Sequence, residues 1–166
     1  LTTLNRLKEF VMKKFTDLVE ACLENVKELF PWDLDEKFKN NENVMLLDIR
    51  EPYEFDTLSI KGSINIPRGI LETACEYDYE ETSPELVQSR DKEIIVICRS
   101  GNRSVLAAHT MQLLGYTNVI SLKTGLRGWN DFELPMVDKD GNTLDIDDAD
   151  DYFDTKLKPD QLSANH

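Results

Sequence analysis

The chain has 166 residues, enough for one domain of ordinary size and short for two. Nineteen basic residues against thirty-two acidic ones give a net charge of −13, which disfavours nucleic acid and anionic membranes as partners. The longest apolar run covers only residues 94–98, far below the roughly 20 residues of a membrane span. Composition and charge therefore predict a soluble globular domain that binds neither nucleic acid nor membrane.

The three cysteines are Cys22, Cys75 and Cys98. Their number and spacing suit neither a disulfide framework nor paired zinc ligands. We therefore expect free thiols, no metal and no cofactor. The N-terminus is Lys-rich and lacks the apolar block of a signal peptide. A cytoplasmic location is predicted, with the periplasm as the alternative if a targeting segment was removed.

Apolar residues at spacings of three and four run from Leu4 to Leu29. This stripe predicts one long amphipathic helix over residues 1–30. We expect it to pack on the chain's own domain, with Cys22 as a small core residue. A homodimer formed through this helix is the alternative. Pro31 suits the first turn of the next helix, for which Leu34 supplies an apolar face.

Short runs of branched residues then alternate with helical segments. The predicted strands cover 44–47, 64–66, 94–97 and 119–122, and the predicted helices lie near 52–57, 68–75, 84–89 and 104–114. Strands that are apolar at consecutive positions and separated by helices are typical of a parallel sheet covered on both faces. We predict an α/β fold with a doubly wound, mainly parallel sheet flanked by helices, carrying an N-terminal helical extension.

Acidic residues dominate the end of the chain. Residues 131–166 contain eleven acids and three lysines, a net charge of −8. Gly141 is fourth from Asp138, whereas an EF-hand loop requires glycine at the sixth position, and Ala149 stands where the last carboxylate ligand would be. We therefore expect a turn at Asp140 and Gly141 followed by a solvated acidic tail. The predicted division is 1–30, 31–135 and 136–166.

The most informative stretch comes directly after the predicted strand 94–97. Cys98 ends this strand at the carboxyl edge, where open parallel sheets place their ligand sites. Amides of the adjoining loop, the positive end of the next helix and two arginines favour a thiolate there. Cys98 is the candidate nucleophile, and the candidate substrate-binding loop consists of Arg99, Ser100, Gly101, Asn102, Arg103 and Ser104.

The length of this loop bears on the anion it accepts. Phosphatases with a cysteine nucleophile have the pattern Cys-x-x-x-x-x-Arg, whereas Arg103 is the fifth residue after Cys98. The tighter ring of amides favours a sulfur atom on the cysteine over a tetrahedral phosphoryl group. A phosphatase or arsenate reductase is therefore the less favoured alternative.

Three segments resemble the rhodanese family of sulfurtransferases. Residues 98–104 (Cys-Arg-Ser-Gly-Asn-Arg-Ser) resemble its active-site loop, residues 47–67 its N-terminal signature, and residues 125–135 its C-terminal one. The resemblance covers roughly residues 31–135. The family usually has Gly-His where Leu58 and Ser59 stand, a departure that we expect to alter local packing rather than activity.

The resemblance implies a two-step sulfur transfer. The Cys98 thiolate would take the outer sulfur of a small donor such as thiosulfate, hold it as a persulfide and pass it to a thiol or cyanide acceptor. Arg99 and Arg103 would attract the anionic donor. A rhodanese-like module that binds partners or senses persulfides without turnover is the alternative.

Other residues that match the family have ordinary structural explanations. For Asp48, Arg50 and Glu54 a structural ion-pair network is favoured over a catalytic role. Trp129 is expected to pack against the sheet, and Cys75, which follows a helical segment, is a less favoured candidate for a resolving thiol.

Overall fold

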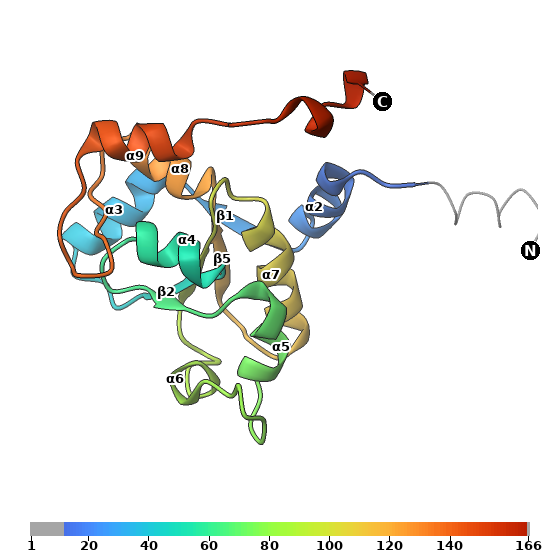
Figure 1. Ribbon diagram of the computed structural model, residues 1–166. Helices are drawn as coiled ribbons and strands as arrows, with labels where there is room; N and C mark the ends of the chain where they lie inside the picture. The colour runs from blue at the N-terminus through green and yellow to red at the C-terminus, as the bar shows by residue number, and fades with distance from the viewer. Residues whose placement is uncertain (1–11, 166) are drawn as a thin grey trace, which may run out of the picture.

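The structure is a computed structural model that describes residues 12–165 (Figure 1). Its strands are β1 (Lys27–Leu29), β2 (Met45–Asp48), β3 (Ile64–Asn65), β4 (Ile94–Ile97) and β5 (Val119–Leu122). Its helices are α2 (Phe15–Leu23), α3 (Pro31–Lys39), α4 (Pro52–Thr57), α5 (Leu71–Ala74), α6 (Pro84–Val87), α7 (Arg103–Leu113), α8 (Gly125–Asp131) and α9 (Ile146–Phe153). Short 3-10 turns are η1 (Arg68–Ile70), η2 (Pro159–Gln161) and η3 (Ser163–Asn165).

The five strands form one parallel sheet in the order β1-β5-β4-β2-β3. The central strand β4 is buried along its whole length. Because side chains alternate along a strand, Ile94 and Val96 enter one apolar cluster while Ile95 and Ile97 enter the other. Helices α2, α5 and α7 cover the first face, and α3, α8 and α9 cover the second (Figure 1). The predicted doubly wound α/β fold is confirmed.

The N-terminal prediction is right in part. Helix α2 exists and packs on its own domain, because Val19 is buried in the first cluster and Cys22 lies against it. The continuous helix to residue 30 is wrong: α2 ends at Leu23, and Lys27–Leu29 form the edge strand β1, paired with β5. The main-chain hydrogen bonds offered by the free edge of β5 outweigh the helical spacing. Positions 1–11 of the predicted helix lie outside the described residues.

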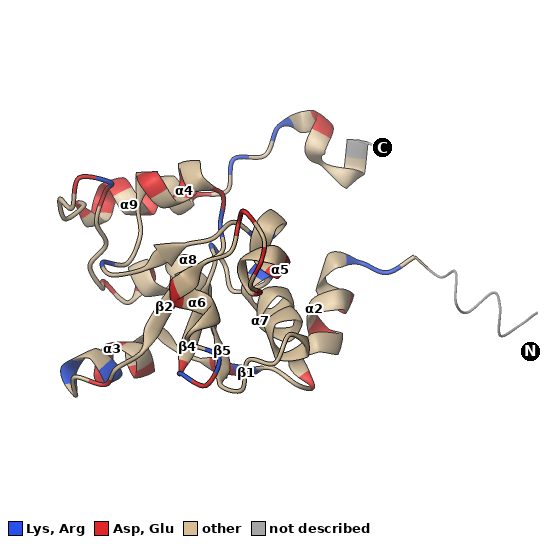
Figure 2. Cartoon of the chain, turned by 90° about the horizontal axis from the view of Figure 1, so that it is seen from below, with Lys and Arg blue, Asp and Glu red and all other residues tan. Residues whose placement is uncertain are grey.

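The C-terminal prediction also needs correction. The turn is present, since the Gly141 amide donates to the Asp138 carbonyl. The segment after it is not merely solvated, because residues 146–153 form helix α9, which buries Ala149 and Phe153 in the second cluster. Helix α9 is rich in acidic residues (Figure 2), and these residues are exposed. Those in its first turn suit the positive helix end. Two apolar positions, four residues apart, were too few to stand out in the sequence.

Among residues 12–165, no helix is long and apolar enough to cross a membrane. The division into segments 1–30, 31–135 and 136–166 stays a prediction.

Candidate active site

Cys98 lies directly after β4, buried at the carboxyl edge of the sheet. Its Sγ accepts hydrogen bonds from the backbone amides of Gly101 (3.1 Å) and Ser104 (3.3 Å). Ser104 Oγ lies 3.3 Å from the same sulfur and 2.7 Å from Ser121 Oγ on β5. The loop thus directs two backbone amides at one sulfur atom.

Two glycines allow the loop that follows Cys98 to lie against the loop after β5. Gly101 has a φ of +85°, and a side chain on it would lie 2.7 Å from the Thr124 amide nitrogen. Gly125 has a φ of +61°, and its added Cβ would lie 2.6 Å from the carbonyls of Cys98 and Arg99. Both positions therefore require glycine. At the start of α8, the amide of Leu126 donates to the Cys98 carbonyl (3.0 Å), which braces the loop.

Arg103 begins α7 and is paired with a carboxylate that comes from α4. Its guanidinium donates to both oxygens of Glu54 at 3.0 Å. Burial raises the pKa of Glu54, but the bonds from Arg103 and from the Glu51 amide outweigh it, so the pKa is lowered. The same pairing raises the pKa of Arg103. This contact, which joins the segment 47–67 to the loop after Cys98, was not predicted from the sequence, where Glu54 was grouped with Asp48 and Arg50.

The structural interpretation of Asp48 and Arg50 is confirmed. Both side chains are fully buried, and Arg50 Nη2 lies 2.9 Å from Asp48 Oδ2. The same nitrogen donates to the Leu58 carbonyl at 2.6 Å. Next to it, Ser59 and Val137 exchange backbone hydrogen bonds of 3.0 and 2.9 Å. Leu58 and Ser59, which stand where the family usually has Gly-His, are therefore held by hydrogen bonds within the domain.

Arg99 is held by helix α9 rather than by the sulfur. Its Nη2 donates to the carbonyls of Tyr152 (3.4 Å) and Phe153 (3.1 Å), and its guanidinium lies over both aromatic rings. Carbonyls at a helix C-terminus attract cations. Sequence reasoning missed this contact because the segment 136–166 read as solvated.

A pocket of about 180 Å³ opens at the loop that follows Cys98. It is lined by Cys98, Arg99, Ser100, Asn102 and Arg103, and by Phe15 from the first turn of α2. Gly101 and Ser104 instead contribute the amides beneath the sulfur. The structure therefore brings the six predicted loop residues together around Cys98 and adds Phe15 to them.

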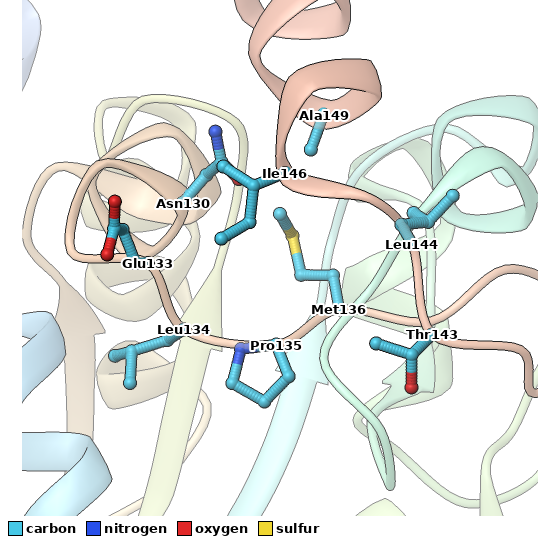
Figure 3. A pocket seen from close by; sticks show the side chains of 9 residues that line it. All are labelled: Asn130, Glu133, Leu134, Pro135, Met136, Thr143, Leu144, Ile146 and Ala149. Carbon is cyan, nitrogen blue, oxygen red and sulfur yellow. The ribbon is translucent and has the colours of Figure 1, made fainter.

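A second pocket, of about 190 Å³, lies where α9 meets α8 (Figure 3). Met136, Leu144, Ile146 and Ala149 give it mainly apolar walls. This pocket lies at the interface where α9 packs against α8 and the segment that joins the two helices. Of the two pockets, the one at the catalytic loop is the one that contains a cysteine, so we place the candidate chemistry there.

The remaining singled-out side chains have structural surroundings. Trp129 is buried and donates from Nε1 to the Pro135 carbonyl at 3.0 Å, which confirms its packing role. Cys75 is also buried, and burial raises the pKa of its thiol to about 11. Within residues 12–165, no group of three or more His, Cys, Asp or Glu side chains could hold a metal ion.

Fold and site together define a class of protein: a doubly wound α/β domain with a cysteine cradled by loop amides between a central strand and a helix. The comparison with protein families gives the particular family. Residues 31–132 match the model of the rhodanese-like domain. This match covers more than half of the chain, and the chain belongs to the rhodanese-like domain family.

Individual relatives differ in how much of their length the chain covers. A Bacillus subtilis protein is 35% identical over 94 residues, which are 57% of this chain and 45% of that relative. The chain thus spans less than half of that protein. A protein of Allochromatium vinosum named "Sulfurtransferase" is 28% identical over 116 residues, covering 70% of this chain and 99% of the relative.

Among solved structures, a Rhodopseudomonas palustris protein of unknown function has the same fold. It superposes with a TM-score of 0.68 at 27% identity, covering 75% of this chain and 95% of that one. Its structure carries the name "Possible Tyrosine Phosphatase".

Proposed function

We propose that this protein is a sulfurtransferase that carries sulfane sulfur on Cys98. The observation that carries the proposal is the sulfur of Cys98 with the amides of Gly101 and Ser104 directed at it. Membership of the rhodanese-like family and the name of the Allochromatium vinosum relative support sulfur transfer in general.

The proposed first step forms a persulfide. The Cys98 thiolate attacks the outer sulfur of a donor such as thiosulfate; a new S–S bond forms, the donor's S–S bond breaks, and sulfite leaves with the electron pair. The loop amides stabilise the negative outer sulfur. In the second step an acceptor thiolate or cyanide attacks that outer sulfur, and the Cys98 thiolate leaves.

The other loop residues act around this sulfur. Arg99, Ser100, Asn102 and Arg103 line the pocket and would contact the donor. Neither arginine is a free cation, because Glu54 holds Arg103 and the end of α9 holds Arg99. Their proposed role is therefore to hold the loop and donate hydrogen bonds, with less net positive charge than the sequence suggested.

A phosphatase is the second candidate, favoured by the name of the Rhodopseudomonas palustris structure. Arg103 would have to hold the phosphoryl group, but both terminal nitrogens of its guanidinium donate hydrogen bonds to Glu54. A carboxylate in that place opposes a phosphate dianion. A module without turnover is the third candidate, and the donors directed at Cys98 Sγ favour catalysis over it.

The test is intact-protein mass spectrometry after incubation with thiosulfate. We expect the protein to gain one sulfur atom, which cyanide then removes. Cys98→Ser should show no gain, whereas Cys75→Ser, the matched change at the other buried cysteine, should behave as the wild type. A wild-type protein that gains no sulfur from thiosulfate or from glutathione persulfide would refute the proposal. Hydrolysis of an aryl phosphate instead would establish the phosphatase.

We further propose a cytoplasmic protein without a cofactor. The described cysteines Cys22, Cys75 and Cys98 are all free thiols, which supports a reducing compartment. The expected partners are a small sulfur donor and a thiol acceptor.

A further inference from the structure

The pocket at Cys98 has one wall that the rhodanese-like match does not include. Phe15 belongs to α2, outside the matched residues 31–132, yet it lines the pocket with five residues of the catalytic loop. Its side chain is 49% exposed. A large apolar ring at the mouth of a reactive pocket loses contact with water only when a ligand covers it.

Phe15 is held in place by the packing of its helix. Val19, one turn later, is buried among residues of α7 such as Val105 and Met111. The side chain of Gln112 on α7 donates to the Asn25 carbonyl just after α2, at 2.9 Å. Since α7 also begins at the catalytic loop, Phe15 and the loop share one rigid support.

The other pocket residues offer an inorganic dianion one positive charge rather than two. Glu54 neutralises Arg103, whereas Arg99 keeps its charge and is held by carbonyls and rings of α9. The pocket therefore combines one cation, the polar groups of the loop and one apolar ring. This combination suits a donor with a sulfur-bearing anionic end and an apolar organic end.

We propose that Phe15 is a specificity-determining residue that selects organic sulfur donors by covering their carbon portion. The inference rests on the proposed sulfur transfer. Thiosulfonates are suitable probes: Cys98 thiolate attacks their outer sulfur, a new S–S bond forms, the donor's S–S bond breaks, and the sulfinate leaves with the electron pair. Methanethiosulfonate and benzenethiosulfonate share this reacting group and differ in apolar size.

The experiment measures kcat/KM for both probes with cyanide as the acceptor. Relative to the ratio with which a small free thiol reacts with the two probes, the wild type should favour benzenethiosulfonate by about a further tenfold, the factor expected from partly burying one phenyl ring. Phe15→Ala should lose this further preference, and Phe15→Leu should retain part of it. The ratio is independent of the active fraction of each preparation, so a partial loss of folding does not mimic the effect.

Leu18→Ala is the matched control. Leu18 is on the same helix and similarly exposed, at 47%, but is not among the residues that line the pocket. It should leave the ratio unchanged. Sulfur transfer with the same ratio in wild type and Phe15→Ala would overturn this inference alone. Failure of the wild type to transfer sulfur from thiosulfate or either thiosulfonate would overturn the proposed function as well.

Discussion

Two buried cysteines lie in different surroundings. Cys75 and Cys98 are equally inaccessible. Burial raises the pKa of Cys75 to about 11, which keeps that thiol protonated at neutral pH. The sulfur of Cys98 instead accepts hydrogen bonds from two backbone amides, those of Gly101 just before α7 and Ser104 in its first turn. Sequence alone could distinguish the two cysteines only by the residues after each: a glycine, two arginines and a helix after Cys98, and acidic residues after Cys75.

The pair of Glu54 and Arg103 yields a prediction about pH. We expect Glu54→Gln to lower the free energy of unfolding by about 2 kcal/mol at pH 7, since two charge-assisted hydrogen bonds are weakened. The pKa of Glu54 is lowered in the folded state, so this stabilisation is present above the ordinary value of 4.5 and is lost as pH falls through the lowered one. Urea denaturation at several pH values measures the difference between the two proteins.

That difference should narrow as the pH falls below 4.5. Glu20→Gln, at an exposed position on α2, serves as the control and should change stability by less than about 0.5 kcal/mol. A Glu54→Gln protein as stable as the wild type at pH 7 would show that the pair contributes geometry without stability.

At the scale of elements, the interior of the sheet was predictable and its borders were not. Residues 94–97 and 119–122 were predicted with the bounds that β4 and β5 have, because both are short runs dominated by branched apolar residues. β1 is a three-residue edge strand, and its Leu29, like Val26 just before it, also fits a helical stripe. Its state depends on a hydrogen-bonding partner, β5, ninety residues away in the sequence, and local spacing cannot reveal such a partner.

Helix α9 was missed for a related reason, and it can be tested directly. Phe153 is buried in the second apolar cluster, while Asp150, Asp151 and Asp154 around it are exposed. We expect Phe153→Ala to lower the free energy of unfolding by about 3 kcal/mol, the cost of removing a buried ring. Urea denaturation measures this, and Leu157→Ala, at an exposed position four residues later, should cost less than about 0.5 kcal/mol. Equal, small losses would mean that the segment is solvated, as its composition suggests.

The candidate site is more dependent on long-range contacts than the loop sequence indicates. Cys98 and the loop after it were predictable because they are contiguous in the chain. The partners of the two arginines come from α4 and α9, and Phe15 comes from α2. Each contact joins residues more than forty positions apart. The sequence therefore indicated the candidate nucleophile and the loop amides around it. It did not reveal that Glu54 binds Arg103 or that the end of α9 binds Arg99.

At the scale of the whole molecule, the net charge of −13 opposes an anionic donor. From the sequence, Arg99 and Arg103 would overcome this field at the site. In the structure Glu54 neutralises Arg103, which leaves the single charge of Arg99 against the acidic surface, so we expect the repulsion of the whole protein to dominate the approach of thiosulfate. Salt screens that repulsion over a Debye length of about 10 Å at 0.1 M. The value of kcat/KM for thiosulfate should therefore rise about two- to threefold between about 10 and 200 mM NaCl.

The matched measurement is the alkylation of Cys98 by iodoacetamide, which is uncharged and should react at nearly the same rate at both salt concentrations. A rise common to both reagents would indicate a change in the loop itself rather than screening. A fall in kcat/KM with salt would mean that Arg99 and Arg103 attract the donor in spite of Glu54 and the carbonyls of α9. The sign of the salt dependence thus decides whether the local cations or the acidic surface control the encounter with the donor.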